Sequence, residues 1–380
     1  LSVGAAIALG LARFSYGLLL PPMRADLGWS YALAGAMNTA NAAGYLLGAL
    51  LTPWLIHRAG AERLLLVGAA TSAVGMALNG SALETGLLLL WRLASGVSSA
   101  WVFITGGLLA ARLAEHRPGS GGLLIGVYYG GTGLGIVVSA LAVPVVLAAF
   151  SSHPHGWTFA WWVLAGACAL GTGVLAVTLR TLDRLGAGDR ASASAAIPAS
   201  APPSPSTSAP RSSIPVANVA PTRAFAWGLA GYGCFGAGYI GYMTFVIALL
   251  RQQGASSARL TLFYSLLGLA CMLSSRLWAG LLDRWRGGQP QAVLNALLGV
   301  ATVLPLIGAS GAWGSVLGLV SGVMFGGVFL SVVASTTALV RHNLPPSQWA
   351  AGISAFTIVF AFGQIVGPTV VGWLSDGPGG

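Results

Sequence analysis

Long apolar segments recur along almost the whole chain, and they constrain its fold more than any other feature. Eleven segments reach or approach the roughly 20 residues that a helix needs to cross a bilayer core. They cover approximately residues 1–22, 32–56, 64–80, 85–111, 121–150, 157–179, 224–250, 260–282, 290–309, 312–340 and 349–373. Since backbone groups cannot face lipid unpaired, the pattern predicts an all-α membrane protein.

The charge content supports this prediction and excludes other classes of protein. Charged residues are 7% of the chain, against about 25% in soluble domains, so the chain cannot cover a water-facing surface. This excludes a soluble enzyme, a disordered protein and a secreted disulfide scaffold. The net charge of +10 comes from arginine alone, since lysine is absent. In a soluble protein that excess would suggest a nucleic-acid partner.

The arginines instead predict an orientation. With the N-terminus inside, twelve arginines fall in cytoplasmic loops and three in outer loops. This distribution follows the positive-inside rule. We therefore expect an integral protein of the bacterial cytoplasmic (inner) membrane, monomeric and in contact with lipid but not with nucleic acid. The N-terminus and the central loop would be cytoplasmic.

One connection is much longer than the others. Residues 180–222 are rich in alanine, serine and proline and cannot bury an apolar core, so they predict a disordered linker. The linker would separate an N-terminal bundle, residues 1–179, from a C-terminal bundle, residues 223–380.

The two halves align at a constant offset of 226 residues without gaps. Leu93-Ala-Ser-Gly-Val97 corresponds to Leu319-Val-Ser-Gly-Val323, and Tyr16 corresponds to Tyr242. A constant register across several helices and loops indicates two parallel six-helix repeats. The partner of the sixth span would begin near position 383, so we expect a twelfth helix to be missing from this chain, which would also start inside its first span. The alternative is a protein with eleven helices.

Several local motifs are typical of one family. The loop after the second span reads Pro53-Trp-Leu-Ile-His57-Arg58-Ala-Gly60, and the loop after the eighth contains Asp283-Arg284. The fourth span carries Arg92-x-x-x-Gly96, and the fifth carries Gly126-x-x-x-Gly130 without the proline that antiporters often have there. Together with the two repeats, these motifs resemble the major facilitator superfamily.

Three further stretches are similar to its YbfB/YjiJ-like branch: Gly10-Leu-Ala-Arg13-Phe-Ser-Tyr16, Asn38-Thr-Ala-Asn41-Ala-Ala-Gly44-Tyr45 and Gly363-Gln364-Ile-Val-Gly367-Pro368. The resemblance implies two six-helix repeats of the major facilitator type and a secondary transporter that works by rocking its two bundles. It assigns conformational gating to Arg58, Asp283, Arg284, Gly96, Gly126 and Gly130.

Two arginines near mid-membrane are the main candidates for substrate binding. Arg13 and Arg92 each lie several residues inside a span, where a charge costs about 2.5–3.5 kcal/mol on insertion scales. The repeat places Tyr239 and Gly318 at the equivalent positions, so the cationic feature is one-sided, as an anion site would be. In the alternative interpretation, either arginine clamps carbonyl groups of neighbouring helices.

Other polar residues at similar depth could line the same cavity. Asn38, Asn41 and Tyr45 form one stripe of the second span, and such stripes serve either as cavity lining or as hydrogen-bonding contacts between helices. Further candidate donors to a carboxylate are Tyr16, Tyr128, Tyr239, Tyr242 and Gln364.

The sequence suggests no cofactor and no metal site. All eight acidic residues fall in loops or at helix ends, so no carboxylate is available at mid-membrane to carry a proton or pair with a cation. No phosphate-binding motif of the G-x-x-x-x-G-K-[ST] type occurs, and His153 and His155 lack a third ligand.

These features favour a secondary transporter, not an enzyme, that moves a small organic anion, a carboxylate above all, by alternating access. A co-transported proton could travel on the substrate's own carboxylate. The alternatives are an efflux transporter for neutral or hydrophobic compounds and, in another class, a receptor or scaffold that does not transport.

Overall fold

The computed structural model describes residues 1–115, 121–195, 223–307, 314–345 and 348–377, and within these ranges every regular element is a helix. In chain order the helices are α1 (Ser2–Ala5), η1 (Ala6–Phe14), α2 (Tyr16–Leu27), α3 (Tyr31–Ala59), α4 (Ala61–Ser81), α5 (Thr85–Glu115), α6 (Gly121–Ala149), α7 (Trp157–Ala195), α8 (Arg223–Gln252), α9 (Ser257–Arg284), α10 (Gln289–Ile307), α11 (Gly314–Asn343) and α12 (Trp349–Ser375).

The helices agree with the eleven predicted spans once α1, η1 and α2 are read as one segment. Ten helical segments are long and apolar enough to cross a membrane. The eleventh, α3, has the length but not the apolarity, because it carries Asn38, Asn41 and other polar side chains and ends in His57-Arg58. Most of those polar groups are buried between helices, so α3 is covered by protein along much of its length.

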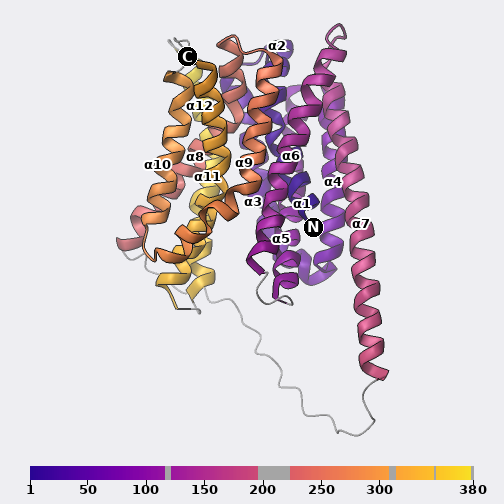
Figure 1. Cartoon of the computed structure of the whole chain (residues 1–380). Helices are drawn as coiled ribbons and strands as arrows, with labels where there is room; N and C mark the ends of the chain where they lie inside the picture. Colours follow the sequence, from indigo (N-terminus) through magenta and orange to yellow (C-terminus); the bar gives the residue numbers. More distant parts are fainter. Residues whose placement is uncertain (116–120, 196–222, 308–313, 346–347, 378–380) are drawn as a thin grey trace.

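The helices form two bundles (Figure 1). In the N-terminal bundle α3 and α4 pack on α5, and α7 packs on α4; in the C-terminal bundle α9 and α10 pack on α11, and α8 on α12. The most extensive contacts between the bundles are those of α6 with α9, α3 with α12, and α2 with α8, and α3 also meets α8. The described part of the chain therefore has six spans in its first half and five in its second.

Helix α7 is longer than expected. It continues to Ala195, so the linker does not begin at residue 180, and Figure 1 shows the helix extending far below the bundles. The physical reason is local: residues 180–195 include four alanines, two leucines and three arginines, which favour a helix, and the first proline after α7 comes only at position 198. The rest of the predicted linker, residues 196–222, lies outside the described residues.

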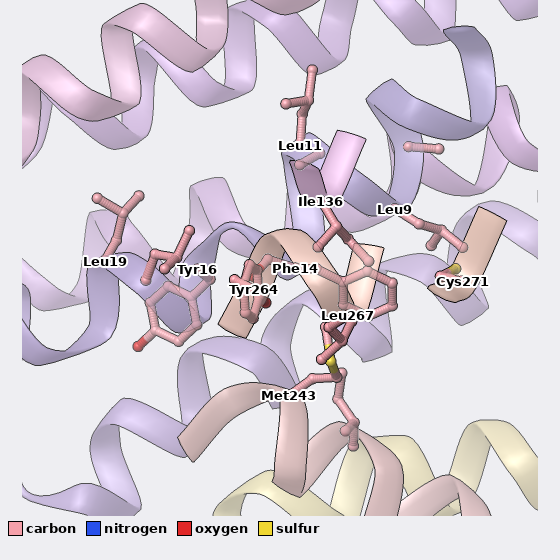
Figure 2. Packing of buried hydrophobic residues seen from close by; sticks show 14 of the residues in the cluster. Leu9, Leu11, Phe14, Tyr16, Leu19, Ile136, Met243, Tyr264, Leu267 and Cys271 are labelled. Carbon is pink, nitrogen blue, oxygen red and sulfur yellow. The ribbon is translucent and has the colours of Figure 1, made fainter. Parts of the chain in front are cut away.

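The helix packing supports the repeat found in the sequence. Gly17 and Met243 occupy equivalent positions, and a side chain on Gly17 would collide with the carbonyl oxygen of Met243. A pair of equivalent residues in contact lies on the symmetry axis that relates the two halves. The core spans this axis, since Figure 2 shows Phe14 and Leu9 of the first half among Tyr264 and Leu267 of the second.

Glycines set the closest helix contacts. A methyl group on Gly44 of α3 would overlap the carbonyl oxygen of Leu93 on α5, and one on Gly96 of α5 would overlap that of Asn41 on α3. In the second half Gly326 of α11 meets the carbonyl oxygen of Leu267, the repeat equivalent of Asn41. These contacts are the small-residue packing expected of membrane helices.

The bundles are tied together at one end of the molecule. We call the end that carries residues 28–30, 150–156, 253–256 and Asp376 the Asp376 end, and the opposite end the Arg58 end. Eight hydrogen bonds between the bundles lie at mid-depth or toward the Asp376 end. The molecule is therefore sealed by hydrogen bonds at the Asp376 end.

The last contact of this seal joins a carboxylate to a helix terminus. The Asp376 carboxylate, just after α12, accepts hydrogen bonds from the backbone N–H groups of Tyr31 (2.7 Å) and Ala32 (2.8 Å) at the start of α3. Desolvation acts to raise the pKa of Asp376, but these bonds, a bond from Ser30 and the attraction of Arg24 outweigh it, so the pKa lies below its ordinary value. The interaction also benefits from the positive end of the α3 dipole.

We predict that Gly44→Ala destabilises the protein, because the added methyl group forces α3 and α5 apart. Overpacking of this kind costs about 1–3 kcal/mol. Thermal unfolding of the detergent-purified protein measures the effect. The matched control is Gly166→Ala on α7, where a side chain meets open space. Equal melting temperatures for the two variants would contradict the role given to Gly44.

We also predict that Asp376→Ala loosens the Asp376 end. A cysteine replacing Thr369, which lies below the carboxylate between α3 and α12, reports the opening through its rate of reaction with a water-soluble maleimide in a protein lacking native cysteines. The rate should rise about two- to fivefold, since a charge at a helix terminus contributes about 0.3–1 kcal/mol.

The same rate should depend on pH only in the protein that keeps Asp376. Since the lowered pKa belongs to the sealed state, the seal is complete near neutral pH and weakens as the pH falls through that pKa. Glu84→Ala, which removes another exposed acid at the same end, is the control and should leave the rate unchanged. If Asp376→Ala leaves the rate of maleimide labelling unchanged, the carboxylate does not hold the bundles together at this end.

Candidate functional site

Arg13 lies at the end of an unusual helical segment. Residues Ala6–Phe14 form a π-helix, whose wider turns are closed by bonds such as Ser15 N–H to the Gly10 carbonyl at 3.2 Å. Gly10 permits this path close to α6, since a Cβ on it would lie 2.5 Å from Cα of Gly135. Because π-helical turns recur at functional sites, the backbone conformation here favours a functional role for Arg13.

The Arg13 guanidinium reaches across to the other bundle. Its Nη2 donates a hydrogen bond of 2.5 Å to Oε1 of Gln364 on α12, and the hydroxyl of Tyr239 on α8 donates one of 2.8 Å to the same oxygen. Arg13 and Tyr239 are repeat equivalents, so the first helices of both halves converge on one acceptor. The Tyr45 ring of α3 lies beside the guanidinium, with its centroid 5.5 Å from Cζ.

The charge of Arg13 has no anionic partner. The side chain is only 2% exposed, and its Nε is buried without a hydrogen-bond partner. In the described ranges Arg13 forms no ion pair, and the acids whose side chains are described, Asp26, Glu62, Glu84, Asp283 and Asp376, all lie at helix ends or in loops. A buried cation held by neutral groups, with one donor unused, is suited to receive an anion.

Arg92 is engaged very differently. Its Nη1 donates to the carbonyl of Ala12 (3.1 Å), its Nε to that of Met37 (3.4 Å) and its Nη2 to Oδ1 of Asn38 (2.5 Å). Its Cζ also lies over the Tyr16 ring at 4.7 Å. Every nitrogen of the guanidinium is therefore used to join α5 to η1 and α3, which is the clamp anticipated as the alternative interpretation.

Two mid-depth hydrogen bonds relate the bundles symmetrically. Asn38 of α3 donates to the Thr244 hydroxyl (2.7 Å), which donates to the carbonyl of Ile240 (2.6 Å). In the other half Tyr264, the repeat equivalent of Asn38, donates to the carbonyl of Phe14, the equivalent of Ile240, at 2.6 Å. Both halves thus use the same position to reach toward the same carbonyl of the opposite first helix.

The remaining candidates do not contact Arg13. Tyr16 donates to the carbonyl of Ala34 (2.8 Å), and Asn41 donates to that of Arg92 (3.1 Å). Tyr128 donates to the carbonyl of Phe103, and the Tyr242 hydroxyl pairs with that of Ser321, each at 2.6 Å. Seven of the nine predicted binding residues therefore form two separate contact groups. Arg13 and Tyr239 meet at Gln364, whereas Arg92 contacts Tyr16, Asn38 and Asn41.

The predicted gating residues lie at two places. Arg58 stacks on the Trp54 ring, with Cζ 4.5 Å from the centroid, and among the described residues it has no bond to Asp283 or Arg284, which end α9. Gly96 packs within the N-terminal bundle. Gly126 and Gly130 of α6 lie against Ser275 and Met272 of α9, at the interface between bundles.

Two contributors were not predicted from the sequence, namely Thr244 and Tyr264. Both are fully buried polar residues at the joint between bundles. Applying the repeat to Asn38 would have pointed to Tyr264, because the two positions are equivalent. No comparable signal existed for Thr244, whose equivalent is the apolar Leu18.

Comparisons with known proteins place the fold. The family model described as "Uncharacterised MFS-type transporter YbfB" matches residues 5–380. No curated protein matches the chain. Among solved structures, the nucleoside transporter NupG, in a point-mutant form, has a TM-score of 0.72 at 14% identity, covering 99% of this chain and 90% of its own.

Two further structures have the same fold. A bacterial homologue of the human lysosomal transporter Spinster, in an inward-facing and occupied conformation, has a TM-score of 0.64 at 16% identity over 99% of this chain and 81% of its own. The D-xylose–proton symporter has a TM-score of 0.63 at 15% identity, and the match covers 99% of this chain and 89% of the symporter.

Because the two arginines are bonded so differently, we predict that replacing them lowers the stability of the protein by different amounts. Arg92→Met leaves the Ala12 carbonyl, the Met37 carbonyl and the Asn38 amide oxygen without their donor, and each buried unpaired group costs about 1–3 kcal/mol. Arg13→Met removes one hydrogen bond and also a buried charge that lacks a counter-ion. The melting temperature in detergent should therefore fall clearly for Arg92→Met and much less for Arg13→Met. Similar losses would refute the division into clamp and free cation.

Proposed function

Because the chain belongs to the YbfB-type family of major facilitator superfamily transporters, we propose that it is a secondary transporter of small organic anions, with a carboxylate as the group it recognises. The family makes it an integral membrane protein with a small-molecule substrate. The class of substrate, the direction of transport and the coupling to a proton are all parts of the proposal.

The observation that carries the proposal is the pairing of Arg13 with Gln364. The amide oxygen of Gln364 accepts from both Arg13 and Tyr239 at the boundary between the bundles. A substrate carboxylate has the same kind of oxygen, with a full negative charge and a second oxygen for the unused Nε. Charge-assisted bonds to a guanidinium are about twice as strong as neutral ones, so a carboxylate would displace the amide.

The seal at the Asp376 end supports alternating access. With the arginine-rich loops on the cytoplasmic side, the Asp376 end would face outward, and the sealed state would be the one closed to the outside. Rocking would exchange the bonds of Asp376, Asn38 and Tyr264 across the interface for contacts at the Arg58 end. Substrate arriving at Arg13 would replace the Gln364 contact that holds the bundles together at mid-depth.

A neutral aromatic or hydrophobic substrate is the second candidate. Tyr239, Phe235, Phe360 and Phe329 form a stack of rings with centroids 5.0–6.1 Å apart beside Gln364. Such a wall would suit an apolar ring, and a transporter that used it alone would not need Arg13.

Coupling to a proton would require a titratable carrier. None of the described acids lies at mid-depth, so we propose that any co-transported proton travels on the substrate's carboxylate. A neutral acid would then cross and lose its proton on release.

The test is uptake of radiolabelled monocarboxylates into proteoliposomes. Arg13→Ala should reduce uptake about 10- to 150-fold, since a hydrogen bond to a charged group is worth about 1.5–3 kcal/mol, and Arg13→Lys should retain part of it. Arg276→Gln, which removes an exposed arginine from α9, is the control and should transport normally. Unchanged anion uptake in both Arg13 variants would overturn the proposal, and uptake of neutral aromatic solutes in their place would favour the second candidate.

A further inference from the structure

A pocket opens at the Asp376 end, away from Arg13. Its volume is about 360 Å³, and its apolar walls include Leu18, Val143, Leu147, Ile247 and Leu260. Leu18, Val143, Ile247 and Leu260 are each less than 5% exposed, so the pocket reaches into the packed interface. The mid-membrane polar residues do not line it.

Both bundles form the walls of this pocket. Helices α2 and α6 and the loop before α7 contribute from the N-terminal bundle, and α8 and α9 contribute from the C-terminal bundle. Beneath it, the contacts of Gly17 with Met243 and of Tyr264 with Phe14 close the interface. The pocket therefore exists as a whole only while the Asp376 end is closed, and its two halves separate when the bundles rock apart.

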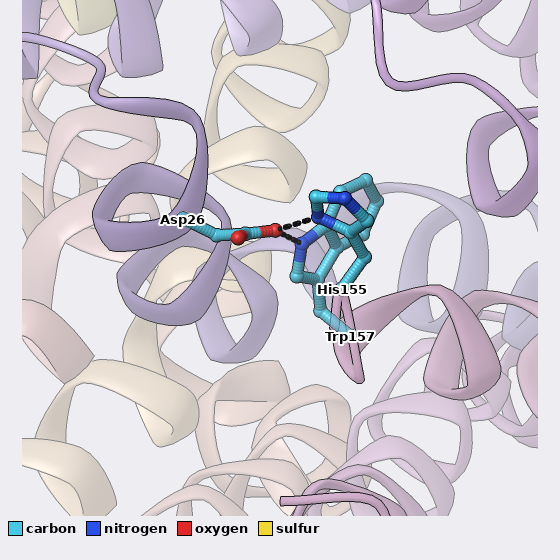
Figure 3. A network of polar contacts seen from close by, with 3 residues as sticks. All are labelled: Asp26, His155 and Trp157. Atoms are coloured by element: carbon cyan, nitrogen blue, oxygen red, sulfur yellow. Dashed lines mark hydrogen bonds and ion pairs between the residues drawn. The ribbon is translucent and has the colours of Figure 1, made fainter. Parts of the chain in front are cut away.

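The acidic group of the lining is already satisfied. Oδ2 of Asp26 lies 2.5 Å from Nδ1 of His155 and accepts a hydrogen bond of 2.5 Å from Nε1 of Trp157 (Figure 3). His155 is held in the left-handed region, with φ of 56°, the one such non-glycine residue in the described ranges. A non-glycine residue in this region is strained, so the surroundings of the imidazole must hold it there.

The basic group of the lining is not satisfied. Arg251, in the last turn of α8, has no hydrogen bond, ion pair or ring contact from its guanidinium to any residue that the structure describes. It is exposed and belongs to the C-terminal bundle, whereas Asp26 and His155 belong to the N-terminal bundle. The pocket thus combines buried apolar walls with one free guanidinium, which matches a ligand with an apolar body and one acidic group.

We propose that this pocket is a second, external binding site for small amphipathic organic acids, and that its occupant holds the Asp376 end closed. The acidic group binds Arg251, and the apolar body lies against α2, α6, α8 and α9. Because a ligand that touches both bundles binds the closed state better than the open one, it shifts the population toward the closed state. An external acid at this site slows the cycle instead of being transported.

The experiment separates this site from the central one. Purified Arg13→Met protein, in which the central cation is removed, is titrated with 4-phenylbutyrate and, as a neutral match, 4-phenylbutyramide, and binding is followed by thermal shift. We expect the acid to raise the melting temperature and to bind about tenfold more tightly than the amide, which corresponds to one charge-assisted contact.

Two variants in the Arg13→Met background locate the binding. Arg251→Gln should weaken binding of the acid about tenfold to the level of the amide, while Arg259→Gln, an exposed arginine on nearby α9, should not. Leu147→Trp fills the pocket and should weaken binding of both compounds. Binding that is unaffected by Arg251→Gln and Leu147→Trp, or no binding at all, would overturn the proposal, whatever the transport assays show for Arg13.

The effect on conformation is measured with spin labels. Cysteines replacing the exposed Ser152 and Ala258, one on each bundle, carry the labels in a protein with Cys168, Cys234 and Cys271 changed to serine. Addition of 4-phenylbutyrate should increase the population with the short distance between labels. An increase of the long-distance population would show that the occupant opens the Asp376 end and would refute its role as a lock.

Discussion

Close backbone contact at glycine is the constraint on which the rest of this structure depends. In lipid, helices gain little from burying apolar side chains against one another, so packing and interhelical hydrogen bonds must hold them. Gly44 and Gly96 bring α3 and α5 together, and Gly17 brings α2 against Met243 of α8. Only at these short separations can side chains such as Asn38 and Tyr264 reach groups of the opposite bundle.

The approximate symmetry of the two halves, and its local breakdown, explain where a site can form. Equivalent residues meet near the axis, where Arg13 and Tyr239 share one acceptor on Gln364, so one half supplies a cation and the other a phenol. Arg92 has three hydrogen bonds to oxygens of neighbouring helices and fixes the N-terminal bundle, whereas Arg13 has one such bond and an unused Nε. The proposed transport cycle would use both: a rigid body that rocks, and a group whose partner can be exchanged.

The sequence by itself determined the class of fold, the number of spans and the repeat, because lipid imposes a length and an apolar composition on every helix that crosses it. It also placed Arg13 and Arg92 at mid-depth and showed that the acids lie elsewhere. It placed the end of α7 too early, because residues beyond the membrane span still favour a helix. It also did not reveal the π-helix of residues 6–14.

Only the tertiary structure decided which arginine is a clamp and which is free. Depth along a helix follows from residue number, but the partners of a side chain depend on how each helix is rotated and which helices cross it. Asn38, Asn41 and Tyr16 share the depth of Arg13, yet packing directs them to Thr244, to the Arg92 carbonyl and to the Ala34 carbonyl. The contact of Arg13 with Gln364, 351 positions along the chain, arises because α12 packs between α3 and α8.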